Sequence, residues 1–194
     1  LRAPTAGNLM LYSILKVENK ETLKTLSSTC DEQPFIASAD FALIFLADYQ
    51  RLYDYFSFNN YFSYCQEQGV VPEFPSLSDL LLCSEDAICA AQNSVIAAES
   101  LDIGSCYIGD IIENYEIHKE LFHLEKLTFP IGMLVFGHYP DNIHRKPRSR
   151  FDSNYIVFDE KYKRFSSDEL HCMFEEYERN FNHTNTKQAK NYAQ

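Results

Sequence analysis

The pattern of apolar and polar positions in the first third of the chain predicts strands alternating with helices. Tyr12 to Val17 reads as a strand, and the continuous apolar run Phe41 to Ala47 has the length of a strand that is buried on both faces of a sheet. Asn19 can cap a short helix from Lys20 to Ser28 between them. We therefore expect a central sheet with helices packed against it.

The middle of the chain carries the strongest helical signals. An aromatic-rich stretch from Tyr49 to Gln68 is predicted to be one helix. A longer helix starts where Ser76 or Ser78 can cap it and runs to about Leu101. Because this second helix is apolar nearly all round, we expect it to be central and buried.

The rest of the chain continues the alternation and defines the predicted fold class. Gly104 to Ile108 and Thr128 to Gly137 read as strands, whereas Ile112 to Leu121 and Ser166 to Asn180 read as helices. The pattern predicts a layered α/β or α+β (mixed α/β) fold, with one domain over residues 1–179. Residues 180–194 are polar, and we expect them to form a C-terminal arm or tail.

Composition narrows the possible partners and the compartment. With 45% hydrophobic residues and no apolar run near the roughly 20 residues of a membrane span, the chain is expected to be a soluble, cytoplasmic protein with no membrane partner. A net charge of −11 would repel a nucleic-acid backbone. The six cysteines have no metal-like or disulfide-like spacing, so we expect free thiols in a reducing compartment. Leu1 is not an initiator methionine, and the opening residues read like the end of a helix that lies before this sequence.

Two loops could bring backbone N–H groups to a ligand. The small residues Ala3 to Asn8 could approach a flat polar molecule, although an ordinary turn has the same composition. Gly104 to Asp110 ends a strand and enters a helix, where unpaired amides can hold an anion or a ring carbonyl. A simple strand-to-helix turn is the alternative, and the absence of G-x-G-x-x-G spacing argues against a dinucleotide-binding fold.

One segment of this acidic chain is basic. Arg145, Lys146, Arg148 and Arg150 surround Pro147, and two of these side chains could converge on a phosphate. A solvated basic loop is the alternative interpretation. The six histidines have no metal-ligand spacing and no G-x-S-x-G motif is present, so neither a metal site nor a serine triad is expected.

Taken in order, these segments resemble the nitroreductase superfamily. The resemblance is to its branch of oxygen-insensitive NADPH nitroreductases and NADPH:flavin oxidoreductases, and it covers most of the chain. It rests on an ordered combination: D-A-x-x-A-A-Q-N-x-x-x-A-A-E-S-L from Asp86, then Y-I-G from Tyr107, then K-P-R from Lys146. Arg2 to Thr5, Phe45 to Asp48 with Arg51, and Phe136 to Pro140 add to it.

The resemblance implies a mixed sheet flanked by helices, built into an intertwined homodimer with FMN at the subunit interface. Two groups of residues would surround the ring and ribityl chain, and two cations would pair with the phosphate. The residues so implied are Thr5, Ala6, Gly7, Asn8 and Met10 in the first loop, Tyr107, Ile108, Gly109 and Asp110 at the strand end, and Lys146 and Arg148.

The resemblance also implies a reaction without catalytic side chains. Hydride would pass from NADPH or NADH to the flavin, and a nitroaromatic, quinone or flavin acceptor would then take its place in a ping-pong mechanism. Met10 stands where the family usually has a glutamine, and Asp110 where a second glycine is common. An ionised Asp110 near the flavin would lower its potential. These departures motivate an alternative: a flavin-binding protein with a sensor, storage or regulatory role and little NAD(P)H turnover.

Overall fold

The computed structural model describes residues 1–72, 75–139 and 148–184, with side chains up to residue 180. The chain divides into two compact units, Leu1–Asn142 and Ile143–Gln194, and each is described by itself. Within the described residues, no helix is both long enough and apolar enough to cross a membrane.

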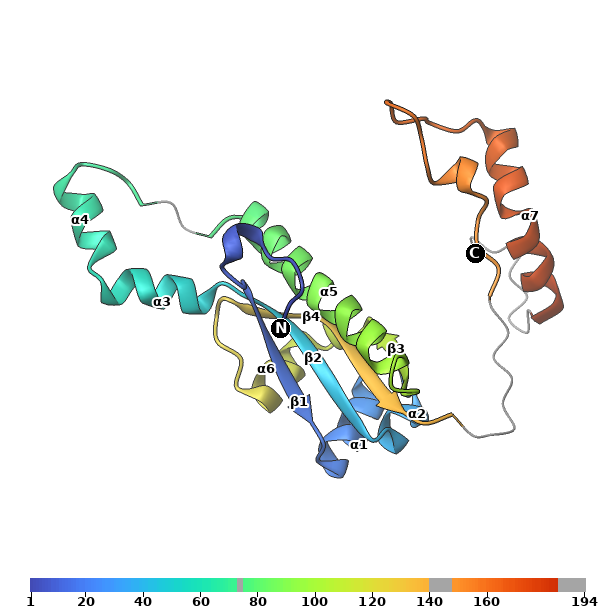
Figure 1. Cartoon of the computed structure of the whole chain (residues 1–194), viewed down its shortest axis with the longest axis horizontal. Coiled ribbons are helices and arrows are strands. Elements are labelled where there is room, and N and C mark those ends of the chain that lie inside the picture. Colours follow the sequence, from blue (N-terminus) through green and yellow to red (C-terminus); the bar gives the residue numbers. More distant parts are fainter. Residues whose placement is uncertain (73–74, 140–147, 185–194) are drawn as a thin grey trace. The chain divides into compact units, whose positions relative to one another are not determined.

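A four-stranded sheet forms the centre of the first unit (Figure 1). Its strands are β1 (Tyr12–Val17), β2 (Phe41–Asp48), β3 (Gly104–Ile108) and β4 (Thr128–Gly137), in the order β1-β2-β4-β3. The four strands predicted from the sequence are confirmed to within one residue. Every described pairing is antiparallel, so the expectation of a mixed sheet is wrong for these four strands.

The sheet separates two layers of core, which explains why β2 is apolar without interruption. On one face Ile44 and Leu46 pack with α1 (Lys20–Thr29) and α2 (Pro34–Ser38), and Phe122 of α6 (Tyr115–Phe122) joins them. On the other face Phe45, between them in sequence, packs against α5 (Leu77–Glu99). Successive strand residues point to opposite faces, so both faces of β2 require apolar side chains. The α+β fold class is thereby confirmed.

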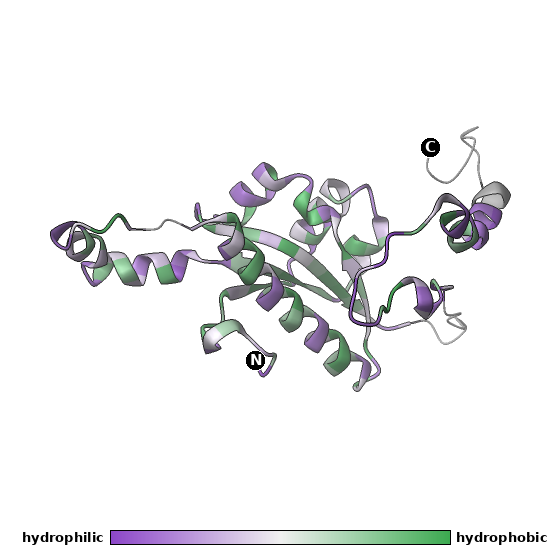
Figure 2. Ribbon diagram, turned by 90° about the horizontal axis from the view of Figure 1, so that it is seen from above, coloured by the Kyte–Doolittle hydropathy of each residue, from purple (hydrophilic) through white to green (hydrophobic). Residues whose placement is uncertain are grey.

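The long helix α5 begins at Ser76, one of the two predicted caps. The Ser76 backbone N–H donates to Oδ2 of Asp79 at 2.7 Å, which closes a capping box. A strip of alanines is buried against the sheet, whereas Leu77 and Ile96 are 71% and 61% exposed. Apolar residues recur along the helix in Figure 2. The expectation of burial all round is therefore wrong for the single chain, in which only one face is covered.

Two further helix predictions need correction, and one short helix was not predicted. The stretch 49–68 forms two helices, α3 (Gln50–Phe58) and α4 (Tyr61–Glu67), because Asn60 between them is left-handed at φ 58°. The short α2 was not predicted, since five residues are too few for a periodic pattern. The helix expected from Ile112 starts at Tyr115, after a 3-10 turn, η2 (Asp110–Ile112).

The second unit contains a 3-10 turn, η3 (Ser153–Tyr155), and α7 (Ser167–Thr184). Phe151 stacks on Tyr177 of α7 with ring centroids 4.7 Å apart. The predicted boundary between residues 179 and 180 falls inside α7, whereas contacts divide the chain after Asn142. How much of the chain folds as one domain therefore stays a prediction.

Candidate functional site

The first predicted loop is anchored by a buried carboxylate. Asp86 of α5 is 4% exposed and accepts hydrogen bonds from the Thr5 hydroxyl, the Ala6 N–H at 2.8 Å and the Leu11 N–H at 3.1 Å. Three donors satisfy a charge that would be costly to bury alone. The loop, which includes the 3-10 turn η1 (Ala6–Asn8), is consequently fixed at both ends to one residue of α5.

The backbone of this loop is in an unusual conformation. Gly7, Asn8 and Met10 all have positive φ, at 55°, 59° and 51°. Left-handed geometry costs energy for a residue other than glycine, and methionine has no short polar side chain to offset that cost. The Met10 N–H donates to the Thr5 Oγ1 at 2.8 Å, and the Thr5 hydroxyl itself donates to Asp86. Asp86 and Thr5 thus maintain the strained loop.

Arg51 of α3 provides a second anchor at the end of the loop. Nε of Arg51 lies 2.9 Å from Oδ2 of Asp48, which is buried at the end of β2. Nη2 of Arg51 donates to the carbonyl oxygens of Met10 and Tyr12 at 2.7 and 2.8 Å. The Ser13 hydroxyl also donates to Asp48. The start of α3 and the start of β1 are therefore joined by one charged cluster.

The second predicted segment, at the end of β3, is open to solvent. Tyr107 is 43% exposed, and its hydroxyl lies 3.5 Å from Oε1 of Gln92 on α5. Ile108 turns into the core, so only its backbone could face a ligand. A Cβ added to Gly109 would meet nothing within 4 Å. A flat molecule could therefore approach the backbone closely at this point.

The carboxylate of Asp110 is engaged on the other face of the sheet. Its Oδ2 accepts a hydrogen bond from Nε2 of Gln33 at 2.8 Å, and the same nitrogen donates to the Cys30 carbonyl at 2.8 Å. Burial raises the pKa of the Cys30 thiol to about 11, and the negative charge of Asp110 adds to this. The Asp110 charge is thus directed toward α1 and α2, whereas the loop and Tyr107 contact α5.

The structure brings two of the three predicted groups to the same helix. The loop is bound at Asp86 and Tyr107 contacts Gln92, six residues or about 9 Å further along α5. Lys146 lies outside the described residues. Arg148 is exposed in the second unit, and the predicted phosphate pair stays a prediction.

Sequence reasoning gave no role to the two carboxylates that organise the loop. Asp48 and Asp86 were noted only as parts of matching stretches. A signal was present, because each is a charged residue at the edge of an apolar run, and such a residue is buried only with partners. The partners themselves lie far away in sequence, so pattern analysis could not identify them.

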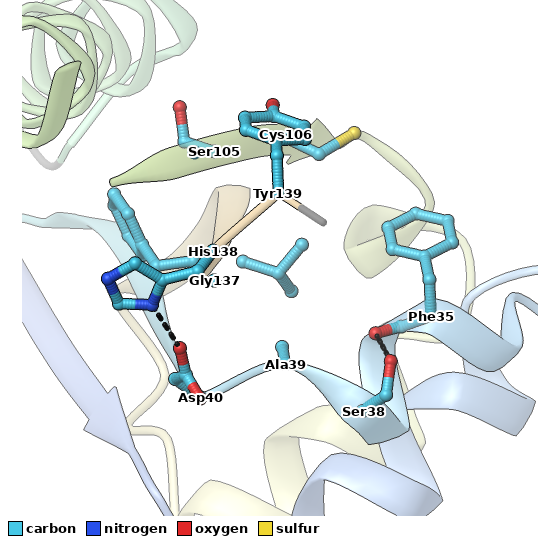
Figure 3. A pocket seen from close by; sticks show the side chains of 12 residues that line it. Phe35, Ser38, Ala39, Asp40, Ser105, Cys106, Gly137, His138 and Tyr139 are labelled. Carbon is cyan, nitrogen blue, oxygen red and sulfur yellow. Dashed lines mark hydrogen bonds and ion pairs between the residues drawn. The ribbon is translucent and has the colours of Figure 1, made fainter. Parts of the chain in front are cut away.

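Two cavities have linings that include neither the N-terminal loop nor Tyr107 to Asp110. One, of about 380 Å³, is bordered by Phe35, Ser38, Cys106 and Tyr139, and Nδ1 of His138 lies 3.3 Å from Oδ2 of Asp40 at its edge (Figure 3). The other, of about 390 Å³, lies at the start of α5. The loop and Tyr107 instead border the outer surface beside α5, where a ligand would be partly open in a single chain.

A sheet with α5 on one face and a strained, glycine-containing loop fixed to that helix defines an α+β protein with a candidate ligand-binding surface beside α5. Residues 1–138 match the Nitroreductase family, and the chain belongs to that family. The resemblance found in the sequence is thereby confirmed.

Named relatives and solved structures agree with this assignment. The chain is 29% identical over 201 residues to the FMN reductase [NAD(P)H] of Bacillus subtilis (strain 168), with 99% of this chain and 75% of the relative covered. It is 30% identical over 148 residues to the FMN reductase (NADPH) of the same organism, with 75% and 56% covered. The structure of NfrA2 from B. megaterium matches with a TM-score of 0.77 and 26% identity, over 98% of this chain and 74% of that one. The chain thus spans between about half and three quarters of these relatives.

Proposed function

We propose that this chain is an FMN-dependent oxidoreductase that takes hydride from NADPH or NADH. The observation that carries the proposal is the strained loop fixed by Asp86, within a chain of the Nitroreductase family. Relatives named FMN reductase [NAD(P)H] and FMN reductase (NADPH) support both the cofactor and the donor.

The predicted cofactor residues fit a flat, uncharged ring. Thr5, Ala6, Gly7 and Asn8 present a glycine-containing backbone beside α5, and the space around Gly109 admits a ring next to the strand end. Bound FMN would supply the hydride chemistry, and the chain would bind it and orient its ring. Met10 would contribute backbone contacts, because its side chain packs into the core.

The phosphate of FMN would be held by Lys146 and Arg148. These are the only charged side chains that we assign to contacts with the cofactor. Cations in this segment suit a phosphate because charge-assisted hydrogen bonds are strong. The Asp110 carboxylate accepts a hydrogen bond from Gln33, so only the backbone of Asp110 is assigned to the ring.

A second copy of the chain would complete the site in a homodimer. Large apolar side chains remain exposed on the outer face of α5, and burying them against an identical helix would be favourable. The site beside α5 would then be enclosed from both sides. We propose that a nitroaromatic, quinone or flavin acceptor enters after the oxidised nicotinamide leaves, which is a ping-pong mechanism.

The second candidate is a flavin-binding protein with a sensor, storage or regulatory role. Met10 at a strained position favours it, because the loop lacks the glutamine that the resemblance leads one to expect. Such a protein would bind FMN and react slowly or not at all with NADPH or NADH.

An absorbance experiment separates these functions. The purified full-length protein is scanned from about 300 to 600 nm, and NADPH and then NADH are added under anaerobic conditions. Flavin peaks that bleach support the reductase and identify the preferred donor. Peaks that persist support the second candidate, and a protein that rejects added FMN contradicts both.

A further inference from the structure

Gln33, in the loop between α1 and α2, is held in place by its own backbone. Its N–H donates to the Ser27 carbonyl of α1 at 2.9 Å, and its carbonyl accepts the Ile36 N–H of α2 at 3.1 Å. The two residues before it, Asp31 and Glu32, have positive φ, at 58° and 48°. Such conformations cost energy for residues other than glycine, so the loop holds Gln33 in position against local strain.

The side-chain amide of Gln33 makes two hydrogen bonds through one nitrogen. Nε2 donates to the Cys30 carbonyl and to Oδ2 of Asp110, each at 2.8 Å. The first contact orients the amide, and the second is strengthened because its acceptor is a carboxylate. Gln33 consequently links the loop after α1 to the first residue of η2.

Two further contacts support the turn η2 from α1 and from the core. Nδ1 of His118 donates to the Ile111 carbonyl at 2.7 Å, and the side-chain amide of Asn114 donates to the Thr29 carbonyl at 2.6 Å. Ile111 itself is fully buried in the core that includes α1 and α2. Gly109, by contrast, is open, since an added Cβ would meet nothing within 4 Å. The turn is thus fixed from α1 while Gly109 stays accessible.

This arrangement separates the backbone of the turn from the charge of Asp110. We assign the backbone of Gly109 and Asp110 to the flavin ring, whereas the Asp110 carboxylate is bound to Gln33. A carboxylate that turned toward an oxidised ring would oppose its reduction, because reduction adds negative charge to the ring. Holding the carboxylate at Gln33 therefore serves both the alignment of the ring and its reduction.

We propose that Gln33 is a positioning residue, which fixes the turn after β3 and keeps the Asp110 carboxylate bound beside α1 and α2. Gln33 itself is not assigned to the ring and acts through Asp110. Its effect on a flavin rests on the proposed function, whereas its hold on the turn depends only on contacts within the chain.

The first test needs no flavin. The backbone N–H groups of Ile112 and Glu113 are hydrogen-bonded within the turn, to Gly109 and Asp110. In Gln33→Met a side chain of similar length loses both hydrogen bonds of the amide. Exchange of the Ile112 and Glu113 amide hydrogens, measured by NMR on the flavin-free, full-length protein, should become about tenfold faster.

Two other variants make this result specific. Gln33→Asn keeps the amide but is one methylene shorter, so it should act like Gln33→Met. Gln50→Met is the matched control, because the half-buried Gln50 also joins a carboxylate to a backbone group, namely Asp54 at 2.9 Å and the Leu127 N–H at 3.1 Å. The control should leave exchange in the turn unchanged. Thermal melting confirms that each variant is folded.

The second test uses the FMN-loaded protein. Gln33→Met should bind FMN about tenfold more weakly, measured by fluorescence quenching, because the backbone that meets the ring is less well positioned. The midpoint potential of the bound flavin should fall, since the released carboxylate can turn toward the ring. Adding Asp110→Asn removes that charge, so the double variant should recover the potential of the parent. A general loss of stability would not respond to the charge in this way.

Three results would overturn the proposal. These are amide exchange in Gln33→Met that equals that of the parent, FMN affinity that Gln50→Met lowers as much as Gln33→Met does, and a flavin potential that Gln33→Met leaves unchanged. If the parent itself rejects FMN, the proposed function fails, and faster exchange in Gln33→Met still supports the hold of Gln33 on the turn.

Discussion

The carboxylate of Asp86 accepts a hydrogen bond from the hydroxyl of Thr5, 81 positions earlier in the chain. Because Asp86 also accepts the N–H groups of Ala6 and Leu11, one buried side chain determines where the N-terminal loop lies. The structure assigns to this contact the role of shaping the surface that we propose for the flavin ring.

Replacing Asp86 with asparagine should both destabilise the protein and weaken flavin binding. An amide offers one acceptor oxygen and brings two donors toward N–H groups, so we expect a loss of about 1–3 kcal/mol in the free energy of unfolding. FMN affinity, measured by flavin fluorescence quenching, should fall about tenfold or more because the loop loses its anchor. The control is Glu85→Gln, at the exposed neighbouring position. Equal FMN affinities in the two variants would contradict the role given to Asp86.

The pair formed by Asp48 and Arg51 should show coupled effects on stability. Arg51→Lys keeps the charge but loses the fork that reaches the Met10 and Tyr12 carbonyls, and we expect a cost of about 1–2 kcal/mol. Urea unfolding of Arg51→Lys, Asp48→Asn and the double variant gives the coupling energy, which should be about 1 kcal/mol. Simple additivity would show that the two side chains act independently.

Gly104 and Gly109, at the two ends of β3, should differ in how much stability the protein loses on substitution by alanine. A Cβ at Gly104 would lie 2.1 Å from the ring of Tyr139, so Gly104→Ala should cost about 1–3 kcal/mol unless the ring is also removed. The double variant Gly104→Ala with Tyr139→Ser should recover most of that loss. Gly109→Ala meets open space and has an ordinary φ of −78°, so its melting temperature should stay unchanged while FMN binding weakens. A destabilised Gly109→Ala would contradict the openness of this position.

Stability should fall as the pH drops below neutrality, in part through His118. Burial lowers the pKa of His118 below its ordinary 6.5, and its Nδ1 donates to the Ile111 carbonyl at 2.7 Å. Below about pH 6.5 the unfolded chain takes up a proton that the folded chain resists, so the folded state loses stability until the pH reaches the lowered pKa. Urea unfolding at pH 8, 7, 6 and 5 should show this slope, and His118→Asn should reduce it. An identical slope in His118→Asn would exclude His118 as its source.

The double variant Lys146→Ala with Arg148→Ala tests the proposed phosphate contacts. If both cations pair with the phosphate, FMN affinity should fall by a few kcal/mol, because each charge-assisted hydrogen bond contributes strongly. Riboflavin, which lacks the phosphate, should bind the variant and the parent equally. Unchanged FMN affinity in a folded variant would reject this placement of the phosphate.

The sequence by itself determined the four strands, the helices α1 and α5, and the family. Strands β1, β2, β3 and β4 follow from apolar runs of strand length, α1 from the Asn19 cap, and α5 from its composition and the Ser76 cap. These signals are local, since caps and periodicity involve residues only a few positions apart. The ordered motifs were sufficient to identify the Nitroreductase family, which the match over residues 1–138 confirms.

Only the tertiary structure decided what surrounds each candidate residue. That Asp110 lies beside a flavin stays a prediction from the sequence, whereas the fold shows that its side chain pairs with Gln33, 77 positions away. In the sequence Asp86 was only one residue of a motif, and the structure shows that the N-terminal loop is bound to its side chain. The sequence likewise did not reveal that one face of α5 is exposed. Composition shows how apolar a helix is, but not which of its faces another element covers. Hydrogen bonds between residues far apart in sequence depend on how the sheet brings those residues together. The local sequence pattern therefore cannot predict them.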